Sequence, residues 1–219
     1  MSFWDILSTI FEGFQVTGVV TAYGLLYAIP FAFVAGIAQY LAKGWARWLV
    51  TLVIEFWRSS PVLILLFAFY YSLPLFGLTL SAMAVASLVL GLNIGGYGSQ
   101  AVRAALQALD KGQIEAGAAL GLTRGQTLAH IELPQAFMAM VPTFMNQLLQ
   151  LIKSTALVSL ITLADMTYRA KEVSQIAFDP VAVYSALLLA YLIVCYPVTV
   201  LGRMIEKRVT RGRRSSDAV

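Results

Sequence analysis

Charged residues are scarce in this chain, and long stretches contain none. Only 12% of the 219 residues are charged and 59% are hydrophobic, whereas charged residues make up about 25% of an ordinary soluble domain. No charge occurs within residues 13–42, 59–102 or 180–202. Because a helix of about 20 apolar residues can cross a bilayer, this composition excludes a soluble domain and predicts an integral membrane protein.

The chain also has only one cysteine, Cys195, and one histidine, His130. A single cysteine excludes an intrachain disulfide, and Cys195 lies in an apolar run that suits a small packing residue. The sequence contains no Gly-x-x-x-x-Gly-Lys-Ser/Thr loop and no His-Glu-x-x-His motif, and its Ser59-Ser60 and Ser154-Thr155 pairs have no nearby base. We therefore expect no catalytic residue, no metal site and no cofactor on this chain.

The apolar runs predict an all-α protein with five membrane spans in a single transmembrane domain, residues 1–219. The run between Arg58 and Arg103 is too long for one span and contains a turn signal, Pro-Leu-Phe-Gly, at residues 74–77. Apolar and aromatic residues at helical spacing also predict short amphipathic helices within residues 1–13 and 45–56. The five spans are expected at about residues 14–41, 54–73, 79–102, 136–163 and 180–202.

The distribution of basic residues predicts the orientation of the chain. With the N-terminus outside, only Arg169 and Lys171 fall outside, and the basic residues that fall inside are Lys43, Arg47, Arg58, Arg103, Lys111, Arg124 and those of the tail at 203–214. The positive-inside rule therefore predicts an outside N-terminus, a cytoplasmic C-terminus and a cytoplasmic loop at residues 104–135. The formal net charge of +4 then reflects membrane topology, and nucleic-acid binding is not expected.

The cytoplasmic loop is predicted to contain two short helices. Residues 114–120 are good helix formers, and Gly121 suits the position just after a helix end. Thr123 is a candidate N-cap for a second helix at residues 124–132, which Pro134 is expected to end. Two helices in a polar loop favour a docking element over a simple connector.

This loop resembles the EAA motif of ABC-importer permeases, in which Glu-Ala-Ala, Gly and Ile-x-Leu-Pro follow one another at fixed spacing. Gly117 replaces the second alanine of the motif. Three other segments resemble the polar-amino-acid branch of these permeases, which includes histidine, glutamine, arginine and opine types: residues 56–61, 93–103 and 153–157. The residues of the loop that carry the resemblance are Glu115, Ala116, Gly117, Gly121, Leu122, Ile131, Leu133 and Pro134.

The resemblance implies the type I ABC importer permease fold and a function in the bacterial inner membrane. The chain would be a multi-pass transporter subunit, not an enzyme, that moves a polar amino acid or a related small polar solute. Its loop at residues 115–134 would couple it to a cytoplasmic ATPase dimer, which binds the ATP and Mg. The other implied partners are a second copy or a sister permease, an extracytoplasmic solute-binding protein and membrane lipid.

Polar side chains within the predicted spans are candidates for a translocation path, because such groups are costly in lipid. Thr143, Asn146, Gln147, Gln150 and Ser154 form one stripe at helical spacing. This stripe either lines the path or forms hydrogen bonds between two permease subunits. The candidate path residues are Arg58, Ser59, Asn93, Gln100, Asn146, Gln147, Gln150 and Ser154.

Relatives of this type often have Glu where this chain has Gln100, and some have Glu at Gln147. The amides remove a negative charge that would attract a cation, which favours a neutral or anionic solute unless a different partner permease supplies the acid. A stand-alone channel or secondary carrier is the alternative function. It would be expected to have coupling-ion carboxylates within the spans, but Glu55 and Asp165 lie near span ends.

Overall fold

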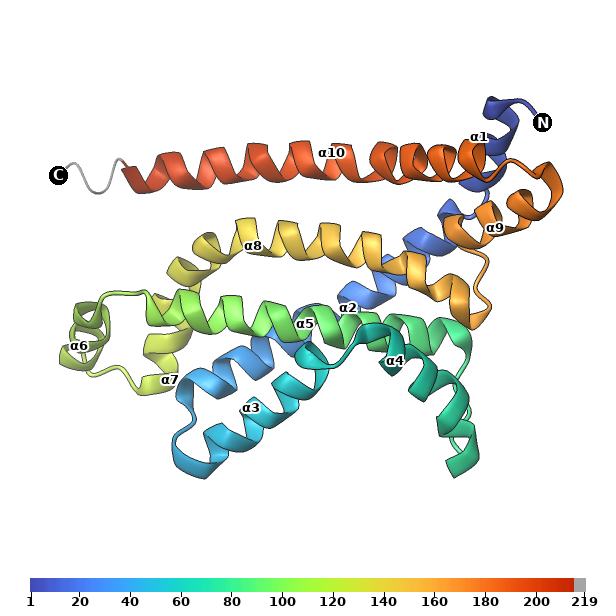
Figure 1. Cartoon of the computed structure of the whole chain (residues 1–219). Coiled ribbons are helices and arrows are strands. Elements are labelled where there is room, and N and C mark those ends of the chain that lie inside the picture. The colour runs from blue at the N-terminus through green and yellow to red at the C-terminus, as the bar shows by residue number, and fades with distance from the viewer. Residues whose placement is uncertain (215–219) are drawn as a thin grey trace.

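The computed structural model describes residues 1–214, and every regular element in that range is a helix (Figure 1). The elements are α1 Phe3–Phe11, α2 Phe14–Leu41, α3 Gly44–Ser59, α4 Val62–Phe67, η1 Ala68–Ser72, η2 Leu73–Phe76, α5 Ala82–Gln107, α6 Lys111–Ala119, α7 Arg124–Thr127, η3 Leu128–Glu132, α8 Leu133–Ser154, η4 Thr155–Ile161, α9 Met166–Ala177 and α10 Pro180–Arg214.

Four helical segments are long and apolar enough to cross a membrane: residues 3–41, 82–107, 124–161 and 180–208. A fifth candidate span is the pair formed by residues 44–59 and 62–76, which is bent by 94°. The predicted all-α membrane fold is therefore confirmed. Each predicted span overlaps one of these segments, and the amphipathic stretches within residues 1–13 and 45–56 are also helical.

The predicted second span, at residues 54–73, differs from the structure because its helix is broken. Ser60 leaves the helical region, with φ −74° and ψ 139°, and Pro61 follows with φ −60° and ψ 116°. Proline disfavours a helical conformation at the residue before it and donates no backbone hydrogen bond. The chain therefore turns between α3 and α4 instead of continuing straight.

Helix α5 lies at the centre of the fold and packs closely along α2 (Figure 1). Glycines allow this approach: a Cβ atom on Gly91 would lie 2.5 Å from the carbonyl oxygen of Gly24. Likewise, a Cβ on Gly36 would lie 2.6 Å from the carbonyl oxygen of Ser99. Small residues are a common means of bringing membrane helices together, because lipid provides little hydrophobic driving force for association.

Three hydrophobic clusters form the core. The largest joins α2, α4, α5, α8 and η4 around Leu66 and Leu90. A second joins α1, α9 and α10 around Ile10 and Met166. The third joins α5, η3 and α8, with the end of α2 packed against it. The third cluster therefore connects the loop at residues 104–135 to the membrane helices.

The loop contains the two predicted helices, joined by a tight turn. Gly121 has φ +74°, and the amides of Gly121 and Leu122 donate to the carbonyls of Ala118 and Gly117, as in a Schellman motif. The Thr123 side chain accepts from the Gln126 amide, so the predicted N-cap is confirmed. The sequence thus correctly indicated how the first helix ends and the second begins.

The prediction that Pro134 ends the second helix is wrong. The chain remains helical from residue 124 to 161, and Pro134 lies in the first turn of α8. The preceding turn, η3, is a π-helix in which the Leu133 amide donates to the Leu128 carbonyl, five residues earlier. This wider turn removes the close approach of a proline ring to the carbonyl four residues before it, so the helix can continue.

Candidate functional site

A cavity of about 590 Å³ opens where α3 breaks, between that break, the middle of α5 and the C-terminal half of α8. Seven of the eight predicted path residues line it, and Gln100 does not. The lining residues are Arg58, Ser59, Ser60, Pro61, Val62, Asn93, Tyr97, Asn146, Gln147, Gln150 and Ser154. Residues from three distant parts of the sequence therefore meet at one place.

Four polar side chains of α8 face this cavity: Asn146, Gln147, Gln150 and Ser154. None of them forms a hydrogen bond with another side chain or backbone group in the part of the chain that the structure describes. An amide at membrane depth without a partner is costly. Water, a solute or a second subunit must therefore satisfy these groups in the assembled protein.

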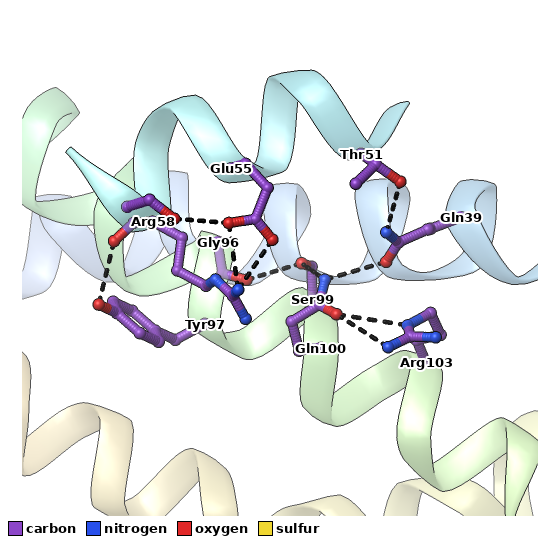
Figure 2. Close-up of polar contacts among 10 residues, drawn as sticks. Gln39, Thr51, Glu55, Arg58, Gly96, Tyr97, Ser99, Gln100 and Arg103 are labelled. Carbon is purple, nitrogen blue, oxygen red and sulfur yellow. Dashed lines mark hydrogen bonds and ion pairs between the residues drawn. The ribbon is translucent and has the colours of Figure 1, made fainter. Parts of the chain in front are cut away.

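The end of α3 is held at the cavity by two side chains of α5. The last carbonyls of a helix have no partner within the helix. Asn93 Nδ2 donates to the Trp57 carbonyl at 2.7 Å. The Tyr97 hydroxyl donates to the Arg58 carbonyl at 3.0 Å (Figure 2). Tyr97 is not among the predicted path residues, although its position four residues after Asn93 places both on one face of α5.

Arg58 is the only charged residue among those that line the cavity. Its Nη2 lies 2.8 Å from Glu55 Oε1, and its guanidinium lies 6.0 Å from the centre of the Tyr97 ring. The Ser59 hydroxyl donates to the same Glu55 carboxylate. About a third of the Arg58 side chain is exposed, so the cation is positioned by its neighbours and still accessible from the cavity.

Gln100 lies away from the cavity, in a network between α2 and α5. Its Nε2 donates to Gln39 Oε1 at 2.9 Å, and its Oε1 accepts from Arg103 (Figure 2). Gln39 in turn donates to the Thr51 hydroxyl of α3. Gln100 is on the same face of α5 as Asn93 but about two turns further along, where α2 closes over it. Its amide therefore joins helices, and the structure does not bring it to the other seven residues.

The loop residues predicted to form the coupling surface divide into exposed and buried groups. Glu115, Ala116 and Pro134 are exposed, and Leu120 beside them is 77% exposed. Leu122, Ile131 and Leu133 are half-buried and pack inward. Gly117 is buried because α6 rests on α7 there. The outer face of α6 is therefore exposed, and its inner face packs against α7 and η3.

Glu132 is a buried residue of the same loop that the sequence did not single out. Its side chain has 0% exposure, and its partners are Arg124 and the Tyr40 hydroxyl. The sequence pattern gives little sign of this contact, because Tyr40 lies 92 residues away. Among the residues described here, no group of three His, Cys, Asp or Glu side chains could hold a metal ion.

The sequence of this chain is similar to those of a known protein family. Residues 28–211 match the family of binding-protein-dependent transport system inner membrane components. The probable amino-acid ABC transporter permease y4tF of Sinorhizobium fredii is 35% identical over 97% of this chain and 92% of its own length. The L-cystine transport system permease TcyB of Bacillus subtilis is 32% identical over 96% and 89%, and the glutamine transport system permease GlnP of Escherichia coli K12 is 30% identical over 94% and 95%.

Solved structures with a similar fold include an amino acid ABC transporter with histidines. That chain superposes with a TM-score of 0.81 at 23% identity and covers 95% of this chain and 99% of its own. The inward-facing MetNI methionine ABC transporter gives a TM-score of 0.75 at 21% identity, with the same coverage. At these identities the structures establish a shared fold.

Proposed function

The chain belongs to the family of binding-protein-dependent transport system inner membrane components, and on that basis we propose that it moves a polar amino acid, or a related small polar solute, into the cell. It is a multi-pass ABC importer permease of the bacterial inner membrane. The observation that carries the proposal is the cavity at the break between α3 and α4, which contains a cation, amides and hydroxyls.

The chemistry of the cavity supports a solute with a carboxylate and no net positive charge. A guanidinium such as that of Arg58 binds carboxylates well, because its donors match the two oxygens. The lining contains no acidic residue, and Gln147 contributes an uncharged amide. Relatives are named for glutamine and cystine, which are neutral polar amino acids. We therefore assign neutral or acidic amino acids to this cavity.

The polar stripe on α8 is proposed to line the path along part of its length. Asn146, Gln147, Gln150 and Ser154 share a cavity with Arg58, which favours contact with solute. Thr143, at the other end of the stripe, is exposed and outside that cavity, which suits contact with a second permease subunit. The two uses of the stripe then belong to different ends of the same helix.

Transport would be driven through the loop at residues 104–135. We place this loop and the C-terminus in the cytoplasm and the N-terminus outside, in agreement with the distribution of basic residues. A cytoplasmic ATPase dimer, carrying ATP and Mg, would dock on the exposed face of α6 around Glu115. A second permease copy or a sister permease would complete the pathway, and an extracytoplasmic binding protein would deliver the solute.

The test is uptake by the complete complex in liposomes that contain ATP. We expect the complex with its binding protein to accumulate glutamine, cystine or glutamate, and the same complex without ATP to accumulate none. Strong uptake of arginine or lysine through a homodimer of this chain would contradict the assigned solute class. Uptake by this chain without an ATPase subunit would instead support the channel or carrier alternative.

A further inference from the structure

Glu132 occupies an unusual position for an acidic residue. Its side chain is completely buried in η3, at the junction between the loop and α8. A buried carboxylate is strongly unfavourable unless it is paired and hydrogen-bonded. Both of its oxygens are engaged: Arg124 binds both with its two terminal nitrogens, and the Tyr40 hydroxyl donates to Oε2 at 2.8 Å.

The partners of Glu132 come from different parts of the fold. Arg124 is the first residue of α7, in the loop, whereas Tyr40 is one residue before the end of α2. The Arg124 guanidinium also lies over the Tyr40 ring, 5.4 Å from its centre. We call these three residues the Glu132 clamp. The clamp joins the loop to the first long membrane helix by contacts that do not depend on the chain connection.

The clamp is buried at Glu132 and partly open to solvent at Arg124, whose side chain is 43% exposed. The Tyr40 ring packs against a buried apolar cluster that includes Leu106, Leu128 and Met140. Electrostatic interactions are stronger in such surroundings than in water. A bidentate guanidinium–carboxylate pair also fixes direction as well as distance. A displacement of η3 relative to α2 therefore has to move the end of α2 or break the hydrogen bond between Tyr40 and Glu132.

Helix α6, where an ATPase would dock, reaches the membrane helices through this same region. Its Gly117 rests on Thr127 and Ile131, which lie in α7 and η3. Its Gln113 side chain accepts a hydrogen bond from Gln135, at the start of α8. A movement imposed on α6 is thus passed first to α7 and η3, where the Glu132 clamp begins.

We propose that Glu132, Arg124 and Tyr40 are positioning residues that carry the movement of the loop into α2 during transport. This inference rests on the proposed coupling of the loop to an ATPase. It predicts that a weakened clamp separates the two activities of the complex: ATP is still hydrolysed, but less solute is moved for each ATP. A clamp that only stabilised the fold would lower both activities in proportion to the amount of intact complex.

The sharpest variant is Tyr40→Phe, which removes the hydroxyl that reaches Glu132 and keeps the ring in the core. We expect the variant complex to assemble and to hydrolyse ATP at a rate within about twofold of the wild type. Uptake per ATP hydrolysed should fall by about tenfold, the size expected for the loss of a hydrogen bond to a charged group. The matched control is Tyr23→Phe, on the same helix, where the hydroxyl has no hydrogen-bond partner among the described residues.

A second variant tests whether the clamp acts as a unit. Glu132→Gln keeps the shape of the side chain and removes its charge, so it should also lower uptake per ATP. If the contacts are shared, the double variant Tyr40→Phe/Glu132→Gln should be no worse than Glu132→Gln alone. Strictly additive losses would show that the two residues act separately and would overturn the clamp.

The remaining outcomes distinguish this inference from the proposed function. If the wild-type complex takes up solute with ATP and Tyr40→Phe has the same uptake per ATP, the clamp does not transmit movement, and the proposed function stands. A parallel loss of uptake, ATP hydrolysis and recovered complex would assign the clamp to folding alone. If the wild-type complex itself shows no ATP-dependent uptake, the proposed function fails and this inference fails with it.

Discussion

At the scale of single residues, two glycines determine the shape of the loop for different reasons. Gly121 has φ +74°, a backbone conformation that residues with a Cβ atom adopt only at a cost in free energy. A glycine at this position therefore permits the turn between α6 and α7. Gly117 has ordinary helical geometry, but a Cβ there would lie 2.8 Å from Thr127 Oγ1 and 2.9 Å from Thr127 Cγ2. Gly117 departs from the usual Glu-Ala-Ala pattern. The Thr127 side chain opposite it explains this departure, because it occupies the space that the Cβ atom of an alanine would need.

Gly117→Ala should therefore destabilise the loop. Overpacking of this kind costs about 1–3 kcal/mol, against a gain of up to about 1 kcal/mol in helix propensity. We expect less ATPase to be recovered with the purified permease. The double variant Gly117→Ala/Thr127→Ala removes the opposing atoms and should restore recovery, and Gly125→Ala, which meets no atom within 4 Å, is the control. A full defect in the double variant would exclude this contact as the cause.

Glu115 provides a separate test of the docking face. Its side chain is exposed and has no polar partner in the described part of the chain. Reversal of its charge should therefore leave the permease fold intact. We expect Glu115→Lys to reduce co-purification of the ATPase by about tenfold, as expected for the loss of an interfacial charge contact worth about 1.4 kcal/mol. Glu12→Lys, on the predicted outer side, is the control, and equal recovery of ATPase with both variants would place Glu115 outside the interface.

At the scale of elements, proline has opposite effects at two helix junctions. Pro61 ends α3, and the chain turns by 94° at this point. Pro134 leaves its helix intact, because the π-helical turn η3 widens in front of it. Proline therefore interrupts the helix at residue 61 but not at residue 134. The difference depends on partners: Asn93 and Tyr97 bind the free carbonyls of α3, and this stabilises the broken end.

Pro61→Ala should remove part of the conformational constraint that keeps α3 and α4 apart. We expect the helix to extend past Ser60 in part of the population, which moves Arg58 relative to α5 and distorts the cavity. Uptake should fall by about fivefold or more, because a misplaced binding group loses a kcal/mol or more of solute interaction. Pro180→Ala is the matched control, since proline at the first position of a helix removes no intrahelical hydrogen bond. Uptake equal to that of the control would show that the bend does not depend on Pro61.

At the scale of the whole molecule, the apolar surface and the unpartnered polar groups both indicate that the chain functions within a larger assembly. Leu188, Leu192 and Tyr196 of α10 are mostly exposed, as expected for a helix that faces lipid or another subunit. The cavity at the α3 break is open, and the four polar side chains of α8 that line it have no hydrogen-bond partner among the described residues. At the C-terminal end of α5, the short helix α6 lies beyond the ends of α5 and α8 (Figure 1).

The orientation of the molecule can be tested with single cysteines. Cys195→Ala gives a cysteine-free background, because the chain has no other cysteine. We expect a cysteine at Ala118, on the exposed face of α6, to react with an impermeant maleimide only after the membrane is opened. A cysteine at Gln175, exposed on α9, should react in intact cells. The reverse pattern would show that the N-terminus is cytoplasmic and that the ATPase cannot dock on α6.

The sequence by itself determined the elements of this protein that depend on local interactions. Long apolar runs specify membrane helices, Gly121 specifies a turn and Thr123 caps the next helix, because each effect acts over a few residues. It also indicated seven of the residues that line the cavity, since polar side chains at membrane depth are costly and usually face a cavity or a partner. What it did not indicate were contacts that depend on the path of the whole chain.

Only the tertiary structure decided which polar groups meet. It removed Gln100 from the cavity, because α2 covers that part of α5. It added Tyr97, whose hydroxyl binds the end of α3. It also paired Glu132 with Tyr40, which lies 92 residues earlier in the chain. Such pairs form because buried polar groups must find partners, and their partners are set by how the helices pack together.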